Sequence, residues 1–172
     1  KFNEYYHSVN GAFTESMHVF INLGLHKIKK QKIKVLEYGF GSGLNAVLTF
    51  LEAKQKDIYY TGVELYPPSN EVLENYYSYF NEKIKTAAES ISNADWENLS
   101  EINSQFRINK LKRDFTQYKP TEKYDLVYFD AFSPESHPSA WTKDVFSNLY
   151  SALNNGGLLL TYSSKGLVKR AL

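Results

Sequence analysis

The sequence contains no cysteine and only one methionine in 172 residues. Without cysteine, the chain has no disulfide, zinc–thiolate site, iron–sulfur cluster or cysteine nucleophile. It also lacks a run of about 18 apolar residues, the length that a membrane-spanning helix needs. Its four histidines show no metal-ligand spacing, so we expect no metal site. These absences agree with a cytoplasmic location, which is our expectation.

Charge of one sign is also missing, because 20 lysines and arginines oppose 19 acidic residues. With 42% hydrophobic residues and a net charge of +1, the chain is not intrinsically disordered. Its length suits one domain with a sizeable core, and we expect a single domain over residues 1–172. A nucleic-acid partner would have to bind a local basic patch, since the net charge offers no general attraction. What the chain has in excess is aromatic residues, at 16%.

Strand-like and helix-like segments alternate along the chain. The strand patterns cover residues 33–38, 58–65, 106–112, 124–129 and 158–162. Helical patterns run from about Thr14, capped by Thr14 or Ser16, to Gly24, and over 44–54, 69–80 and 142–153, while residues 81–104 lean towards helix. This order predicts an α/β, Rossmann-like fold, a mostly parallel sheet with helices on both faces. Ligands of such sheets bind beyond the carboxyl ends of the strands.

A glycine-rich loop, residues 37–43 (EYGFGSG), joins the first strand to its helix. Glycines there permit positive φ and a close approach of backbone to ligand, and the helix start offers free N–H groups. A dinucleotide fingerprint would have Gly or Ala where this chain has Leu44. The next strand ends at Glu64, whose carboxylate can accept hydrogen bonds from two ribose hydroxyls.

Glu37 helps to distinguish the possible ligands of this loop. Its carboxylate would repel a pyrophosphate but suits a ligand with a free ammonium group. S-adenosylmethionine has an ammonium, a sulfonium, a ribose and an adenine, and no phosphate, so we predict it as the cofactor. NAD or another nucleotide, and glycines that serve packing alone, are the alternatives. Asp114, after the third strand, is expected to reach the adenine amino group, although its position is also typical of a turn cap.

The segment Asp130-Ala131-Phe132-Ser133-Pro134 follows the fourth strand. The Asp130 carboxylate can accept a hydrogen bond from an incoming amine, orient it towards a methyl donor and take its proton. Phe132 can contact a flat ring or a sulfonium. The alternative is an aspartate that caps a turn. We therefore predict that Asp130 and Phe132 form the reacting corner of the site.

These motifs resemble the methyltransferase domain of the tRNA 5-methylaminomethyl-2-thiouridine biosynthesis enzymes. The similar segments cover nearly the whole chain, at residues 4–8, 11, 14–20, 37–45, 128–134, 141–142, 161–166 and 170–172. The glycine loop alone would fit many methyltransferases. The segment that begins at Asp130, together with Glu15-Ser16, is far more specific.

The resemblance implies a class I methyltransferase fold with S-adenosylmethionine as methyl donor. It implies methylation of the exocyclic amine of 5-aminomethyl-2-thiouridine at the tRNA wobble position, with Asp130 holding that amine. The N-terminal block, residues 1–30, would cover the cofactor. The expected cofactor contacts are Tyr5, Glu15, Glu37, Gly39, Phe40, Gly41, Gly43, Asn45, Glu64 and Asp114. The expected substrate contacts are Trp141, Tyr162 and Lys165. His7, in the N-terminal block, is a further candidate to line the site.

The remaining predictions concern the partners of the chain, the extent of its domain and the alternative functions. The tRNA anticodon stem-loop would meet a basic face formed by Lys27, Lys29, Lys30, Lys32, Lys34, Lys110, Lys112, Arg113, Lys165, Lys169 and Arg170. The alternative for residues 27–34 is an ordinary solvated surface. The family continues beyond the segment that matches Leu172, so we expect that a C-terminal antiparallel hairpin unit of about 50 residues is missing or disordered. Some members carry a fused flavin-dependent oxidoreductase domain that makes the amine. The alternative functions are an amine or amide methyltransferase for a protein or small molecule, and a non-catalytic binding module.

Overall fold

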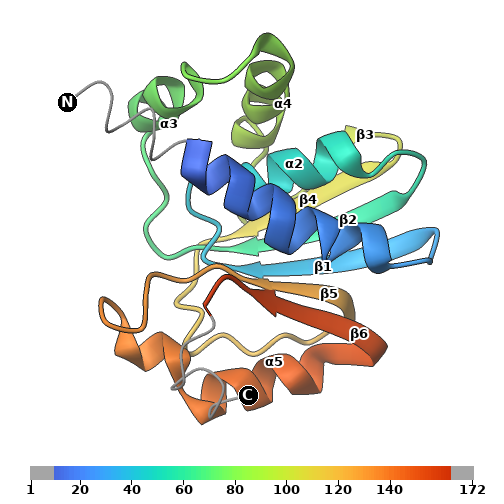
Figure 1. The fold of residues 1–172 in the computed structure, drawn as a ribbon, viewed down its shortest axis with the longest axis vertical. Helices are drawn as coiled ribbons and strands as arrows, with labels where there is room; N and C mark the ends of the chain where they lie inside the picture. Colours follow the sequence, from blue (N-terminus) through green and yellow to red (C-terminus); the bar gives the residue numbers. More distant parts are fainter. Residues whose placement is uncertain (1–9, 164–172) are drawn as a thin grey trace.

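The computed structural model describes residues 10–163 and contains a six-stranded sheet of order β3-β4-β2-β1-β5-β6 (Figure 1). Neighbouring strands run parallel, except that β3 and β4 are antiparallel. The strands are β1 (Lys32–Tyr38), β2 (Asp57–Val63), β3 (Leu99–Asn103), β4 (Phe106–Leu111), β5 (Tyr124–Phe129) and β6 (Leu153–Thr161). The predicted α/β class and mostly parallel sheet are confirmed.

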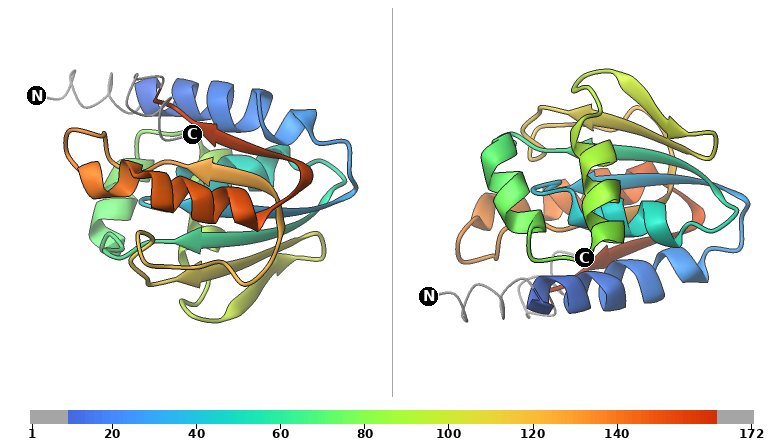
Figure 2. Two further views of the ribbon diagram at one scale, coloured as in Figure 1. Left: turned by 90° about the horizontal axis from the view of Figure 1, so that it is seen from below. Right: turned by 90° about the horizontal axis from the view of Figure 1, so that it is seen from above.

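Helices cover both faces of the sheet (Figure 2). Residues 10–22 form one helix whose second half, η1 (Met17–Asn22), is π-helical. It packs beside α2 (Leu44–Glu52) on one face, with α4 (Glu82–Ser92) and α3 (Asn70–Tyr77) further along. The opposite face carries η3 (Pro138–Trp141) and α5 (Lys143–Ala152), and a short turn, η2 (Leu25–Lys27), precedes β1. Among the described residues, no helix has the length and apolar character to cross a membrane.

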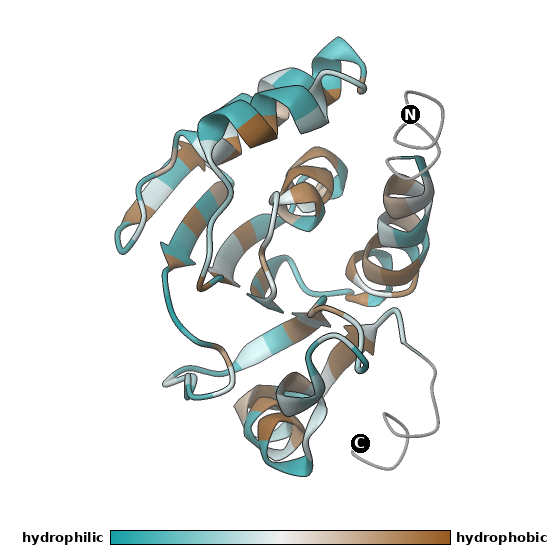
Figure 3. Cartoon of the chain, turned by 90° about the vertical axis from the view of Figure 1, so that its left-hand side faces the viewer, coloured by the Kyte–Doolittle hydropathy of each residue, from teal (hydrophilic) through white to brown (hydrophobic). Residues whose placement is uncertain are grey.

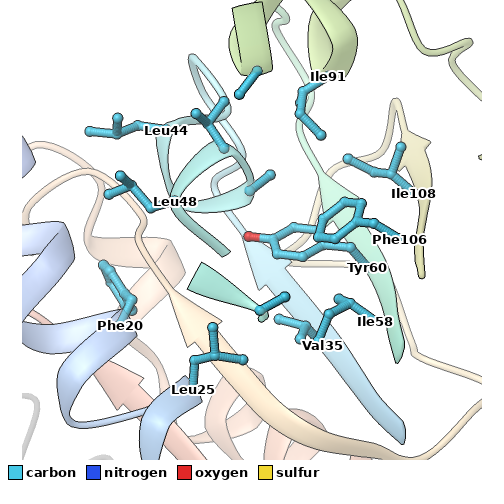
Figure 4. Packing of buried hydrophobic residues seen from close by; sticks show 14 of the residues in the cluster. Phe20, Leu25, Val35, Leu44, Leu48, Ile58, Tyr60, Ile91, Phe106 and Ile108 are labelled. Carbon is cyan, nitrogen blue, oxygen red and sulfur yellow. The ribbon is translucent and has the colours of Figure 1, made fainter. Parts of the chain in front are cut away.

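The strands alternate their side chains between two apolar clusters, as the period of two requires. On β1, Ile33 and Val35 join the cluster under α2, whereas Leu36 and Tyr38 join the cluster under α5. Figure 4 shows the first cluster, in which Tyr60 reaches from the sheet towards α2. The apolar faces of the helices turn towards the sheet and the polar faces turn outwards (Figure 3). This packing fixes the carboxyl ends of the strands at one edge.

Three local predictions need correction. Residues 81–104 are not helical throughout, because α4 ends at Ser92 and β3 pairs with β4 as an edge strand. Its polar sequence, LSEIN, has no strong apolar alternation, so only pairing with β4 makes it a strand.

The first helix is already formed at residue 10, and Thr14 does not cap it but donates its hydroxyl to the Asn10 carbonyl (2.8 Å). Ser16 makes no side-chain cap bond either, and β6 begins at Leu153, before the predicted residue 158.

Candidate active site

The carboxyl ends of β1, β2, β4 and β5 border a cavity of about 390 Å³. This is the place where parallel α/β sheets bind their ligands. The first helix closes one side of the cavity with Ala12, Glu15 and Ser16. The remaining lining residues are Gly39, Phe40, Gly41, Ser42, Leu44, Asn45, Glu64, Leu65, Tyr66, Tyr76, Asp114, Phe115, Asp130, Ala131, Phe132 and His137. Most of the predicted cofactor residues within 10–163 therefore meet around one cavity.

The glycine loop depends on left-handed backbone. Gly39, Gly41 and Gly43 have φ values of +85°, +52° and +80°, which favour glycine strongly. A Cβ at Gly39 would lie 2.5 Å from the Asp130 carbonyl oxygen, so this glycine lets the loops after β1 and β5 touch. A Cβ at Gly41 would meet only the Gly39 carbonyl oxygen, at 3.8 Å. Its position therefore leaves room for a ligand against the backbone.

Glu64 holds this loop in place. One of its carboxylate oxygens accepts a hydrogen bond from the Gly41 N–H (3.0 Å) and the other accepts from the Tyr66 N–H (2.9 Å). A carboxylate has about four acceptor sites, so each oxygen can still accept a ligand hydroxyl. This geometry is compatible with the predicted ribose contact.

Asp114 lines the cavity and caps its own turn. It accepts hydrogen bonds from the Thr116 N–H (2.9 Å), the Thr116 hydroxyl (2.6 Å) and the Gln117 side chain (3.1 Å). The Thr116 hydroxyl is the main cause of a lowered pKa for Asp114. The turn cap that we weighed as an alternative is therefore present, and the contact with adenine stays a prediction.

Glu37 lies behind the cavity rather than on its wall. Its side chain is 0% exposed, and its two oxygens accept hydrogen bonds from Asn45 Nδ2 (2.8 Å) and the Tyr60 hydroxyl (2.7 Å). Burial raises the pKa of Glu37 well above its usual range, so the neutral acid is favoured. Glu37 therefore does not line the cavity, whereas Asn45, which donates to it, does; a contact between Glu37 and the cofactor stays a prediction.

Asp130 is half-buried on the cavity wall. Its Oδ2 accepts a hydrogen bond from Asn45 Nδ2 (2.9 Å). Burial raises the pKa of Asp130 to about 6, with a further rise from the charge of Glu15, while the bond from Asn45 opposes the rise. A carboxylate that titrates close to neutral pH is suited to exchange a proton with a ligand.

The loop after β5 presents Phe132 and is held from behind by two other aromatic residues. Phe132 is 77% exposed and lines the cavity, while its carbonyl accepts a hydrogen bond from Trp141 Nε1 (2.8 Å). The Tyr162 hydroxyl donates to the Ala131 carbonyl (2.9 Å). Trp141 is 2% exposed and packs edge-on against Phe129. Neither Trp141 nor Tyr162 lines this cavity, and each bonds a carbonyl of the loop after β5; their contact with a substrate stays a prediction.

Phe40 also serves the core more than the ligand. Its ring packs edge-on against Trp96, with centroids 6.0 Å apart, and lies against Gly62, where a Cβ would come within 2.3 Å of the ring. The predicted contacts Tyr5, His7 and Lys165 lie outside the described residues. Several lining residues escaped prediction, His137, Phe115, Tyr76 and Tyr66 among them, because no local pattern marks a residue that the fold brings to a cavity.

The charges around the cavity are of one sign. Its lining includes the carboxylates of Glu15, Glu64, Asp114 and Asp130 and, within residues 10–163, no lysine or arginine. Such a site attracts cations and repels phosphates. In addition, the buried Oδ1 of Asn45 has no hydrogen-bond partner within the described residues, and a ligand N–H would satisfy it. A ligand with an ammonium, a sulfonium and a ribose, as in S-adenosylmethionine, fits this set of groups.

The predicted basic face is less continuous than expected. Lys110 is buried and donates to the Ile91 and Ser92 carbonyls, so it cannot contact phosphate. Lys30, Lys34 and Arg113 each form an ion pair, with Asp125, Glu122 and Glu97 respectively. Within the part of the chain that the structure describes, no three acidic or histidine side chains cluster as metal ligands would.

Comparisons with known proteins agree with this architecture. Residues 71–172 match a family model described as S-adenosyl-L-methionine-dependent methyltransferase. The chain is 28% identical over 190 residues to the tRNA 5-methylaminomethyl-2-thiouridine biosynthesis bifunctional protein MnmC of Paraburkholderia phymatum, and 28% identical over 181 residues to that of Campylobacter fetus. The matches cover 99% and 98% of this chain but only 29% of each relative.

A solved structure shows the same fold. The crystal structure of MNMC2 from Aquifex aeolicus superposes with a TM-score of 0.76 at 22% identity, over 93% of this chain and 53% of that one. The names of these relatives confirm the resemblance that the sequence motifs indicated.

Proposed function

The chain belongs to the S-adenosyl-L-methionine-dependent methyltransferase family, and from this premise we propose that it methylates the aminomethyl group of 5-aminomethyl-2-thiouridine at the tRNA wobble position. The product would be 5-methylaminomethyl-2-thiouridine. The observation that carries the proposal is the placement of Asp130, a titratable carboxylate on the wall of a cavity lined by acidic residues.

Asp130 acts on the amine in this proposal. Its oxygen accepts an N–H hydrogen bond, turns the nitrogen lone pair towards the methyl donor and receives the proton that the amine loses. The bound cofactor supplies an electrophilic methyl group on a sulfonium. Glu15 adds negative charge near Asp130, which attracts the protonated form of the amine into the site. Phe132, exposed beside Asp130, offers a ring face to the base.

The remaining carboxylates would bind the cofactor. Glu64 would accept hydrogen bonds from the ribose hydroxyls, Asp114 would lie by the adenine, and the glycine loop would pass against the methionine part. Gly39, Phe40 and Asn45 line this wall, whereas Gly43 does not line the cavity and packs against the Phe40 ring. Tyr5 remains a proposed cofactor contact and Lys165 a proposed substrate contact. Glu37 would act only through Asn45.

The proposal that tRNA is the substrate is supported by the relatives, whose names refer to tRNA 5-methylaminomethyl-2-thiouridine biosynthesis. Those relatives are called bifunctional, and this chain spans about 29% of their length. We propose that an oxidoreductase, fused or separate, supplies the amine. Action on tRNA would place the reaction in the cytoplasm.

The deciding experiment supplies labelled S-adenosylmethionine and two tRNAs. One carries 5-aminomethyl-2-thiouridine at the wobble position and the other carries 2-thiouridine without the aminomethyl group. We expect label on the first tRNA only, recovered in the modified wobble nucleoside. No transfer to that base by a folded protein would refute the proposal.

A second candidate is an amine methyltransferase that acts on a protein or small molecule. It is favoured by the cavity itself, whose carboxylates select a cationic amine and do not specify RNA. Transfer to free amines or peptides, with none to the aminomethyl tRNA, would support this candidate. Binding of S-adenosylmethionine without transfer to any amine would indicate a binding module instead.

Replacing Glu64 with alanine is expected to weaken S-adenosylmethionine binding by about 100-fold or more. The substitution removes hydrogen bonds to a charged group, each of about 1.5–3 kcal/mol, and frees the Gly41 and Tyr66 N–H groups that the carboxylate holds. Calorimetric titration would measure the dissociation constant. The matched control is Glu101→Ala, at the β3 edge, which should bind normally. An unchanged constant in Glu64→Ala would contradict the ribose assignment.

A further inference from the structure

One side-chain amide joins two carboxyl groups behind the cavity. Asn45 is 2% exposed, and its Nδ2 donates one hydrogen bond to Glu37 Oε1 (2.8 Å) and another to Asp130 Oδ2 (2.9 Å). The residue lies in the first turn of α2, where its backbone carbonyl accepts a hydrogen bond from the Thr49 hydroxyl (2.7 Å). The amide is thus held by the helix and by both carboxyl groups.

These bonds allow only one orientation of the amide. If the group were turned over, its oxygen would face Oδ2 of Asp130, which is an acceptor whenever Asp130 is ionised. The Tyr60 hydroxyl donates to Glu37 Oε2 (2.7 Å) and so holds the other oxygen, Oε1, beside the amide. Both Nδ2 hydrogens are therefore committed, and one of them always points at Asp130.

The contact is specific to one oxygen of Asp130. Oδ2 accepts from Asn45, whereas no hydrogen bond to Oδ1 occurs within residues 10–163. We propose, on the basis of the proposed function, that Asn45 is the positioning residue of the reacting carboxylate: it fixes Oδ2 of Asp130 and leaves Oδ1 for the incoming amine. Glu37 serves as the buried anchor from which Asn45 is aimed.

Asn45 is the hydrogen-bond donor to the Asp130 carboxylate within residues 10–163, so its removal changes the titration of Asp130. The other groups that face Asp130 are Glu15 from the first helix, Glu37 from β1, Tyr60 from β2 and Tyr162 after β6. The Glu15 carboxylate disfavours its charge, as does burial, and the two hydroxyls are bonded elsewhere. Loss of Asn45 therefore raises the pKa of Asp130 from its value of about 6.

The test is a titration of the full chain, free of ligands, followed by 13C resonances of the aspartate carboxyl groups. The Asp130 signal is identified by its absence in Asp130→Asn. We expect Asn45→Ala to raise the midpoint by about one pH unit, the equivalent of one hydrogen bond to a carboxylate. Asn45→Leu, which preserves the side-chain volume, is the second variant. Asn109→Ala, on β4 outside the cavity, is the matched control and should leave the midpoint unchanged.

Two outcomes overturn the inference. One is an unchanged midpoint in a folded Asn45 variant. The other concerns the unmodified protein, in which the chemical shifts of the Asn45 side-chain amide protons must change with the same midpoint as Asp130. Amide shifts that do not follow this midpoint would exclude the contact. Neither measurement needs substrate. If the titration behaves as expected but tRNA receives no methyl group, the proposed function fails while the positioning role of Asn45 stands.

Discussion

Replacing Asp130 with alanine is expected to reduce methyl transfer by about 100-fold or more, while S-adenosylmethionine binds with nearly unchanged affinity. The loss corresponds to the contribution of a positioned acid–base group. Affinity should largely persist because Glu64 and the glycine loop are joined to each other, and Asn45 is the proposed cofactor contact within residues 10–163 whose side chain is bonded to the Asp130 side chain. Single-turnover rates with aminomethyl tRNA, and calorimetry with the cofactor, separate the two effects.

A matched aspartate shows whether the effect belongs to the site. Asp144 lies exposed in the first turn of α5, outside the cavity, so Asp144→Ala should keep the transfer rate of the unmodified chain. Asp130→Asn keeps the shape of the side chain and removes its charge, and it should be as slow as the alanine variant. Near-normal turnover in either Asp130 variant would remove this residue from the reaction.

Replacing Gly39 with alanine is expected to displace the cofactor loop. The new Cβ would lie 2.5 Å from the Asp130 carbonyl oxygen, and φ at this position is +85°. The strain and overlap should lower the free energy of unfolding by about 1–3 kcal/mol. Because the two loops that the substitution pushes apart carry Gly41 and Asp130, both cofactor affinity and transfer should fall more than tenfold. Thermal unfolding, calorimetry and rate measurements check these three effects.

Gly11→Ala is the control for that substitution. A Cβ at Gly11 would meet nothing within 4 Å, and the residue is exposed on the first helix. Alanine there should be neutral or stabilise the helix by up to about 1 kcal/mol. If Gly39→Ala behaved like Gly11→Ala, the loops after β1 and β5 would not be in the close contact that the structure shows.

Much of the site was predictable from local pattern because strand ends carry their own signal. The loop 37–43 breaks an apolar run with three glycines, and Glu64 and Asp130 each follow such a run. Parallel strands bring these ends together by topology, so their meeting needs no knowledge of side-chain packing. β3 could not be predicted in this way, because its five residues gain strand structure only from the backbone of β4.

The roles of aromatic residues were harder to predict from sequence. An aromatic side chain near a reactive loop can face a ligand or support the loop, and composition does not distinguish these roles. Trp141 and Tyr162 proved to be supports, since each uses its polar atom on a carbonyl of the loop after β5. Phe132, the residue that their bonds hold in place, remains exposed at the cavity.

By itself the sequence determined the α/β class, the cofactor loop and the carboxylates at the strand ends, because apolar periodicity and glycine placement act over a few residues. Only the tertiary structure decided which of these groups face the cavity. Glu37 stands next to the glycine loop in sequence yet is sealed behind Asn45, whereas Glu15, far away in sequence, lines the cavity with Asp130. The reason is physical: burial, charge and hydrogen-bond partners belong to neighbours in space, and the packing of helix on sheet chooses those neighbours.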